Sequence, residues 1–193
     1  MSRFRAAIAP IAVAGMLGLA ACTQFALVAP EQPVTLGGTY LIDPQIAWSK
    51  LSSGPRESWT VDGPLLNQVR FYNGLIGGSP LREVRVTKPD PMPLFRPSMS
   101  PLEIRDFVVA SFARDNQQNI ATENLRPFAF GPDPGFRFEY SYTAGDGLKK
   151  KGFVVGAVHD RKLFLIVYSA PAIYYYDRYR DTVEKMVASL RIT

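Results

Sequence analysis

The chain has 193 residues, of which 47% are hydrophobic and 20% are charged, and its formal net charge is +5. These values are typical of a globular domain and exclude both wholesale disorder and a protein with several membrane spans. The basic residues are spread along the chain and form no stripe with interleaved aromatic residues, so we expect no nucleic-acid partner. The sequence gives no indication of the oligomeric state.

The N-terminus has the pattern of a bacterial export signal. Arg3 and Arg5 form a positively charged start, and residues 6–19 form an uncharged apolar stretch. The stretch ends in Leu19-Ala20-Ala21-Cys22, which resembles the lipobox of bacterial lipoproteins. This resemblance implies a signal peptide over residues 1–21, cleavage between Ala21 and Cys22, and lipid attachment to the Cys22 sulfur.

The residues around Cys22 predict where the protein is held. An acylated Cys22 would anchor the protein to the periplasmic face of a membrane, and several acyl chains together give a stable membrane anchor. Thr23 follows Cys22 where inner-membrane lipoproteins commonly carry aspartate, so the resemblance favours the outer membrane. Residues 22–38 are predicted to comprise the acylated Cys22 and a flexible tether, because the segment contains Pro30, Pro33 and a Gly pair. The alternative is an uncleaved membrane helix, because residues 6–29 carry no charge and could nearly span a bilayer.

Cysteine and histidine usage limits the chemistry of the domain. Cys22 is the one cysteine in the chain, so we expect no disulfide, and a single histidine argues against a transition-metal site. We therefore expect no metal and no cofactor. That histidine, His159, lies beside Asp160 in a sequence that predicts a solvated hairpin turn. A serine hydrolase would need a serine brought to His159, and no Gly-x-Ser-x-Gly motif is present.

Residues 39–193 are predicted to form a single domain with an antiparallel sheet of about six strands. A turn at Asp62-Gly63 predicts an early hairpin, with Trp48 and Trp59 packed beneath it. The last two strands are apolar on both faces, which requires cover on both sides of the sheet. The stretches with strand character are 39–50, 58–62, 68–72, 120–130, 135–143, 152–158 and 163–168.

Two helices are predicted to cover the two faces of the sheet. Ser100 has the features of an N-cap, with Pro101 at the first helical position and Glu103 placed to complete a capping box, and this helix runs to about Asn116. A second helix is predicted from Pro171 to about Leu190. The order of elements from residue 135 onward, with its closing helix, resembles the PsbP-like fold. This resemblance implies an α+β (α/β/α) sandwich with helices on both faces, and it implies no ligand or partner.

Three surface features are candidates for binding. Lys149, Lys150 and Lys151 beside a hairpin turn could contact anionic head groups, although charged hairpin ends also serve solubility. Tyr174 and Tyr175 cannot both face the core together with Tyr176, because successive helical residues point about 100° apart. Phe95 lies in a proline-rich connector over residues 88–101, which either faces a partner or packs against its own domain.

These observations favour a lipid-anchored, non-enzymatic protein of the cell envelope that binds or helps assemble another envelope component. One alternative is a module that holds a lipid or a small apolar ligand between sheet and helix. A third hypothesis is a hydrolase, which would need a buried polar cluster that the sequence does not display.

Overall fold

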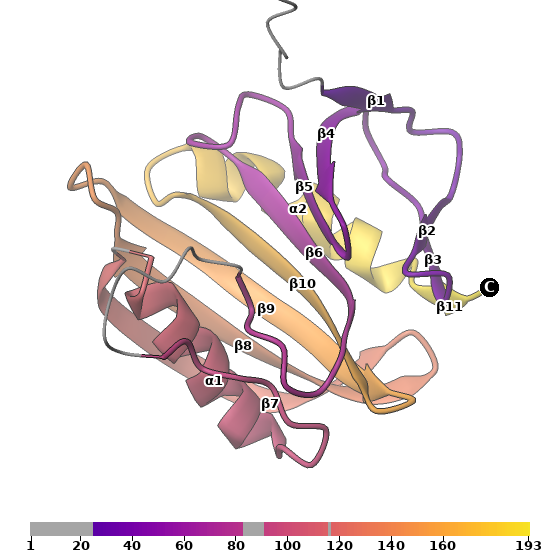
Figure 1. Cartoon of the computed structure of the whole chain (residues 1–193). Helices are drawn as coiled ribbons and strands as arrows, with labels where there is room; N and C mark the ends of the chain where they lie inside the picture. Colours follow the sequence, from indigo (N-terminus) through magenta and orange to yellow (C-terminus); the bar gives the residue numbers. More distant parts are fainter. Residues whose placement is uncertain (1–24, 83–90, 116) are drawn as a thin grey trace, which may run out of the picture.

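The structure is a computed structural model, and it describes residues 25–82, 91–115 and 117–193. Within these ranges an eight-stranded antiparallel sheet, a sheet of three short strands and two helices form an α+β domain (Figure 1). The strands of the large sheet, in spatial order, are β1 (Ala26–Val28), β4 (Trp48–Ser53), β5 (Arg56–Thr60), β6 (Gln68–Leu75), β10 (Lys162–Pro171), β9 (Lys149–His159), β8 (Asp133–Thr143) and β7 (Gln118–Phe130).

The small sheet contains β11 (Arg191–Ile192), β3 (Tyr40–Ile42) and β2 (Val34–Leu36), in that order. Its inward residues Leu36, Tyr40 and Ile42 belong to the same core as Trp48 and Trp59, which are both buried as predicted. The small sheet therefore packs on one face of the large sheet and joins the first strands of the chain to its last strand.

The prediction of a flexible tether is wrong for the described residues from Phe25 onward, because two short strands form there. Strand β1 pairs with β4, where Val28 lies opposite Trp48, and β2 pairs with β3. Val28 and Leu36 are buried in the core, so burial of apolar side chains fixes a segment whose prolines and glycines had predicted a coil. Because these short strands were missed, the expected number of about six strands is also too low.

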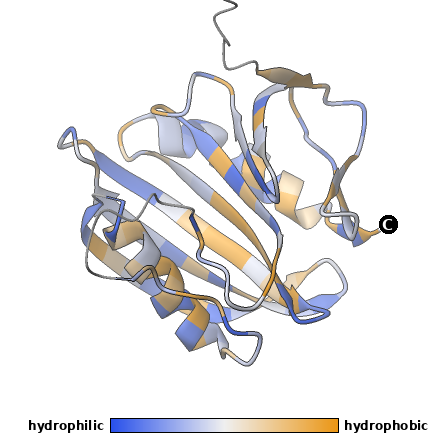
Figure 2. Cartoon of the chain, in the orientation of Figure 1, coloured by the Kyte–Doolittle hydropathy of each residue, from blue (hydrophilic) through white to orange (hydrophobic). Residues whose placement is uncertain are grey.

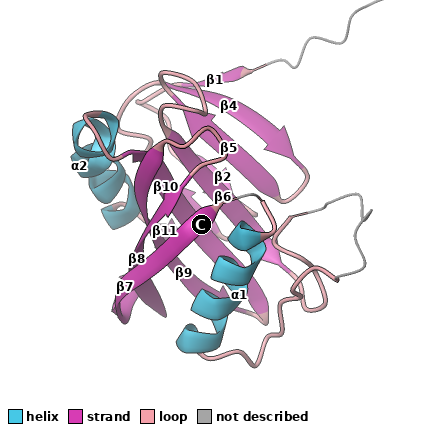
Figure 3. Cartoon of the chain, turned by 90° about the vertical axis from the view of Figure 1, so that its left-hand side faces the viewer, coloured by secondary structure: helices cyan, strands magenta, loops and turns pink. Residues whose placement is uncertain are grey.

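The helices cover opposite faces of the large sheet, as predicted (Figure 3). Helix α1 (Pro101–Ala113) packs against one face, mainly against β7 and β8. Helix α2 (Tyr175–Ala188) packs against β9 and β10 on the other. Figure 2 shows hydrophobic residues along the central strands and both helices. The buried residues are Ile104, Phe107, Val108 and Phe112 on α1, and Tyr179, Val183, Met186 and Val187 on α2.

The predicted start of α1 is confirmed, whereas that of α2 is wrong. The Ser100 hydroxyl accepts from the Glu103 N–H, and the Ser100 N–H donates to the Glu103 carboxylate at 2.7 Å, which completes the capping box. Pro171 does not begin α2, because it still pairs with Lys150 as the last residue of β10. Helix α2 begins only after Tyr174, whose backbone has a φ of +70°.

Neither described helix is long and apolar enough to cross a membrane. The predicted signal peptide over 1–21 and Cys22 lie outside the described residues, so their assignment stays a prediction. The PsbP-like resemblance also stays a prediction.

Candidate functional site

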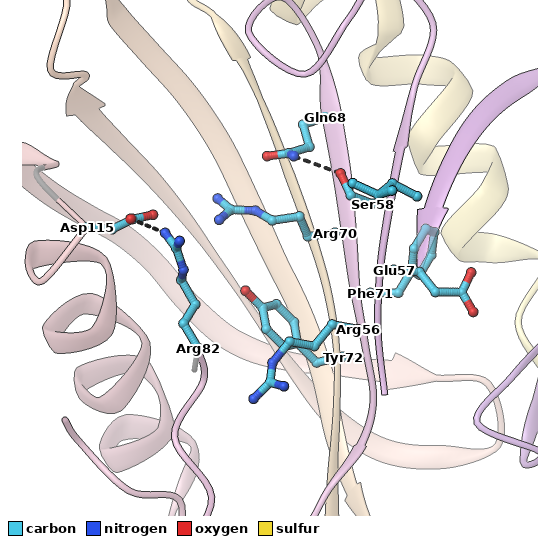
Figure 4. A pocket seen from close by; sticks show the side chains of 10 residues that line it. Arg56, Glu57, Ser58, Gln68, Arg70, Phe71, Tyr72, Arg82 and Asp115 are labelled. Atoms are coloured by element: carbon cyan, nitrogen blue, oxygen red, sulfur yellow. Dashed lines mark hydrogen bonds and ion pairs between the residues drawn. The ribbon is translucent and has the colours of Figure 1, made fainter. Parts of the chain in front are cut away.

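A pocket of about 330 Å³ opens on the α1 side of the large sheet, beside β5 and β6. Helix α1 packs mainly against β7 and β8, and its Phe112 side chain reaches Arg70 of β6. The lining residues come from β4, β5, β6, the segment after β6 and the turn after α1 (Figure 4): Leu51, Arg56, Glu57, Ser58, Gln68, Arg70, Phe71, Tyr72, Arg82 and Asp115.

Arg70 lies at the centre of this pocket. Alternation along β6 places Val69 and Phe71 in the core under α2, and it places Arg70 and Tyr72 on the α1 face. The guanidinium carbon of Arg70 lies 5.3 Å from the centroid of the Phe112 ring, a cation–π contact. Its Nε atom is buried and has no hydrogen-bond partner in the part of the chain that the structure describes.

The surroundings keep Arg70 charged. Although burial opposes its charge, neighbouring Tyr72, Tyr140, Tyr142 and Asp115 raise the pKa of Arg70 above its ordinary value. Burial also raises the pKa of Tyr140 far above the usual range for tyrosine, so its phenol stays protonated. The pocket therefore has a permanent positive charge, and the Ser58 and Tyr72 hydroxyl groups belong to its lining.

Three other polar side chains around the pocket, Arg56, Arg82 and Gln68, already have partners. Arg56 donates to the carbonyl oxygens of Leu81 and Pro80 at 3.0 Å each, and Arg82 forms an ion pair with Asp115. Gln68 donates to the Ser58 hydroxyl at 2.7 Å, and an amide cannot act as a general base for that serine. The arrangement suits the binding of a polar ligand group, and it places no activated nucleophile at Ser58.

Sequence reasoning missed this pocket because Arg70 looks like an ordinary solvent-facing residue of a half-buried strand. The available signal was weak: Arg70 and Tyr72 share one face of their strand, and Tyr140 and Tyr142 share one face of theirs. Sequence alone does not show that both pairs face the same side of one sheet.

The three predicted lysines do not act together. Lys149 and Lys151 are exposed on β9, whereas Lys150 is buried, and its ammonium group donates to the Leu65 carbonyl at 2.8 Å. Burial lowers the pKa of Lys150. The expectation of a three-lysine anion contact is therefore wrong for Lys150, because alternate residues of a strand face opposite sides of the sheet.

Of the three aromatic residues predicted as a partner surface, only Tyr174 is largely exposed. Tyr174 is 60% exposed, and its ring meets that of half-buried Tyr175 edge to face at 5.1 Å. Phe95 is completely buried, so its assignment to a partner surface is wrong. It packs with Leu81 and Phe107 in the core under α1, and the connector around it thus lies against its own domain.

His159 is not the solvated turn residue that the sequence predicts. Its Nδ1 lies 3.1 Å from Asp133, and the Asp133 carboxylate also accepts a 2.5 Å hydrogen bond from the Tyr40 hydroxyl. The other ring nitrogen of His159 lies 3.6 Å from Asp160, and no serine hydroxyl bonds to the ring among the described residues. This cluster joins the small sheet to the ends of β8 and β9.

Asp133, which begins β8 after the turn from β7, is occupied by two neighbouring side chains. Asp133 is engaged by Tyr40 and His159, and the described residues hold no group of three or more His, Cys, Asp or Glu side chains that could bind a metal ion.

Comparison with known proteins gives little guidance. No family model matches the chain, and no curated protein matches its sequence. Among solved structures, it is similar to LpqN of Mycobacterium tuberculosis, a protein described as involved in cell envelope biogenesis, with 11% sequence identity and a TM-score of 0.38. The similarity covers 88% of this chain and 91% of LpqN.

Proposed function

We propose that this protein is a lipid-anchored accessory of the bacterial cell envelope that binds another envelope component and has no enzymatic activity of its own. The observation that carries the proposal is Leu19-Ala20-Ala21-Cys22, which follows a charged start and an apolar stretch. The acylated form would stand on the periplasmic face, in the outer membrane rather than the inner one because Thr23 follows Cys22.

The geometry of the domain supports binding over catalysis. The pocket at Arg70 offers fixed charge and hydroxyl groups, while His159 is held between two carboxylates. A charged pocket also disfavours a purely apolar ligand, because such a ligand would cover the Arg70 charge without compensating it, which is costly. The PsbP-like sandwich is part of this proposal, as a scaffold that presents the pocket.

Cys22→Ser tests the anchor in cells that express the full chain. We expect it to abolish incorporation of a labelled fatty acid and to release the protein from the membrane fraction. Thr23→Ser is the matched control and should leave both unchanged, whereas Thr23→Asp should move the anchored protein towards the inner membrane. Membrane retention of Cys22→Ser without acylation would instead support an uncleaved membrane helix.

The binding role is tested by crosslinking in intact cells. A photoreactive amino acid at exposed Tyr174 should give a discrete adduct with an envelope component, identified by mass spectrometry. The same group at Leu102, exposed on α1, is the comparison position. Turnover of hydrolase substrates by the purified protein, lost when one acidic or serine residue is replaced, would contradict the non-enzymatic assignment.

A further inference from the structure

We propose that the pocket at Arg70 binds the oxyanion group, carboxylate or phosphate, of a small molecule. This inference rests on the proposed binding function, for which it names the chemical class of ligand. It follows from three features of the pocket: an unsatisfied guanidinium, a set of donors that converge on the same space, and a small volume.

The unsatisfied guanidinium is the first feature. Ionised groups inside proteins are kept with partners, because an isolated buried charge loses its hydration without compensation. Arg70 has a buried Nε–H with no acceptor in the described chain, and the carboxylate nearest to it in the lining, Asp115, is engaged by Arg82. An anionic ligand would supply the missing acceptor.

Arg137 on the opposite face also has a buried Nε without a partner in the described chain, but its two terminal nitrogens are compensated. Arg137 donates to both oxygens of Glu184 at 2.6 Å. No described carboxylate makes such a pair with Arg70. The planar fork of an arginine fits two oxygens of one carboxylate or phosphate in the same way, so the pocket has the donor half of a bidentate pair.

Further donors converge on that position. Figure 4 shows the Tyr72 hydroxyl directed towards Arg70, and the Gln68–Ser58 pair on the other side of the guanidinium. Ser58 is the strand partner of Arg70, so the sheet fixes its place. Burial and the nearby charge of Arg70 both lower the pKa of Lys150, so a second cationic side chain lies near Arg70 and adds to the attraction for an anion.

The volume limits the ligand. About 330 Å³ is at the small end of the range for ligand pockets, and exposed Leu51 gives the rim an apolar side. The pocket thus fits an oxyanion on a compact body with some apolar surface. It does not fit an acyl chain or a polymer buried along its length.

The decisive experiment is a titration of the purified full chain followed by NMR of the arginine Nε–H groups. The probes are inorganic phosphate and acetate, each against chloride at constant ionic strength. The resonance assigned to Arg70, identified by its absence in Arg70→Gln, should shift and saturate with at least one probe. The stronger probe distinguishes a phosphate from a carboxylate ligand.

Arg178→Gln is the matched control, because it removes the same charge from an exposed position on α2. Arg70→Gln should weaken binding of the stronger probe by at least about tenfold, the usual effect of losing a hydrogen bond to a charged group. Arg178→Gln should change it less than about twofold. Arg70→Lys should restore only part of the affinity, because an ammonium group lacks the fork.

Two results would overturn the anion site. One is an Arg70 resonance that neither probe moves, and the other is an equal loss of affinity in Arg70→Gln and Arg178→Gln, which would reflect net charge alone. Both results are independent of the anchor. Negative titrations with normal acylation at Cys22 reject the anion site only, and saturable binding by a chain that is never acylated rejects the anchor only.

Discussion

Arg137 donates from both terminal nitrogens to the two carboxylate oxygens of Glu184, at 2.6 Å each, and so joins β8 to α2. The Arg137 side chain is only 3% exposed, and its guanidinium carbon lies 4.1 Å from the centroid of the Phe153 ring. A charge on the α2 face of the sheet is thus compensated by the helix that covers it.

Removal of the Glu184 charge should destabilise the domain. Glu184→Gln leaves Arg137 buried with only Glu139, at 3.9 Å, as a second carboxylate, so we expect the free energy of unfolding to fall by about 2–3 kcal/mol. Urea unfolding monitored by circular dichroism measures this loss. Asp181→Asn, on the exposed face of the same helix, should change stability by less than about 0.5 kcal/mol, and equal effects of both variants would contradict the prediction.

Gly152 should not tolerate a side chain, because β9 passes too close to its neighbours there. A Cβ atom at this position would lie 2.2 Å from the Tyr168 carbonyl oxygen and 2.6 Å from the Tyr140 ring. We expect Gly152→Ala to cost about 1–3 kcal/mol in thermal or urea unfolding. Gly145→Ala, with nothing within 4 Å of its Cβ, is the control and should be nearly neutral. A neutral Gly152→Ala would show that the strands can separate locally.

The capping box of α1 should contribute a stability that depends on pH. Ser100→Ala removes the N-cap and should lower the free energy of unfolding by about 1 kcal/mol near neutral pH. Hydrogen bonds from Ser100 lower the pKa of Glu103, so this contribution is present above the ordinary glutamate pKa and is lost as the pH falls through the lowered value. The difference in stability between wild type and Ser100→Ala should therefore become smaller in acid, while the bond from the Glu103 N–H to the Ser100 hydroxyl keeps part of it. A difference that grows in acid would exclude the capping interaction as its cause.

The Tyr179–Asp62 hydrogen bond should be visible in an alkaline titration. Burial and the 2.5 Å bond to Asp62 raise the pKa of Tyr179 to about 12. A raised tyrosine pKa stabilises the fold below about pH 10 and loses that effect as the pH rises towards 12. Asp62→Asn should lower the pKa of Tyr179, as measured by tyrosinate ultraviolet absorbance with Tyr179→Phe to identify its signal. An unchanged titration would show that burial alone sets this pKa.

Much of the fold could be predicted from local patterns. The capping box at Ser100, the alternation in β8 and the apolar runs of β9 and β10 are local signals, and they led to the correct elements and to helices on both faces. Strands β1 and β2 were missed because each has only three residues, and only their long-range pairing distinguishes them from a coil.

The candidate site depended on relationships that no local pattern displays. Arg70 is a binding candidate only because β6 pairs with β10 and because α1, which packs mainly against β7 and β8, leaves a pocket beside β5 and β6. The predictions that Lys150 and Phe95 lie at the surface were wrong for a similar reason. Each has a partner distant in sequence, the Leu65 carbonyl for Lys150 and the α1 core for Phe95.

Strand β1 has a mechanical consequence for the anchored form proposed above. It begins at Ala26, four residues after Cys22, and an extended link of that length reaches at most about 14 Å. The domain would therefore lie against the bilayer surface, and any load on the anchor would pass directly into the short β1–β4 ladder. A partner of the anchored form would therefore have to approach within about one domain's breadth of the lipid.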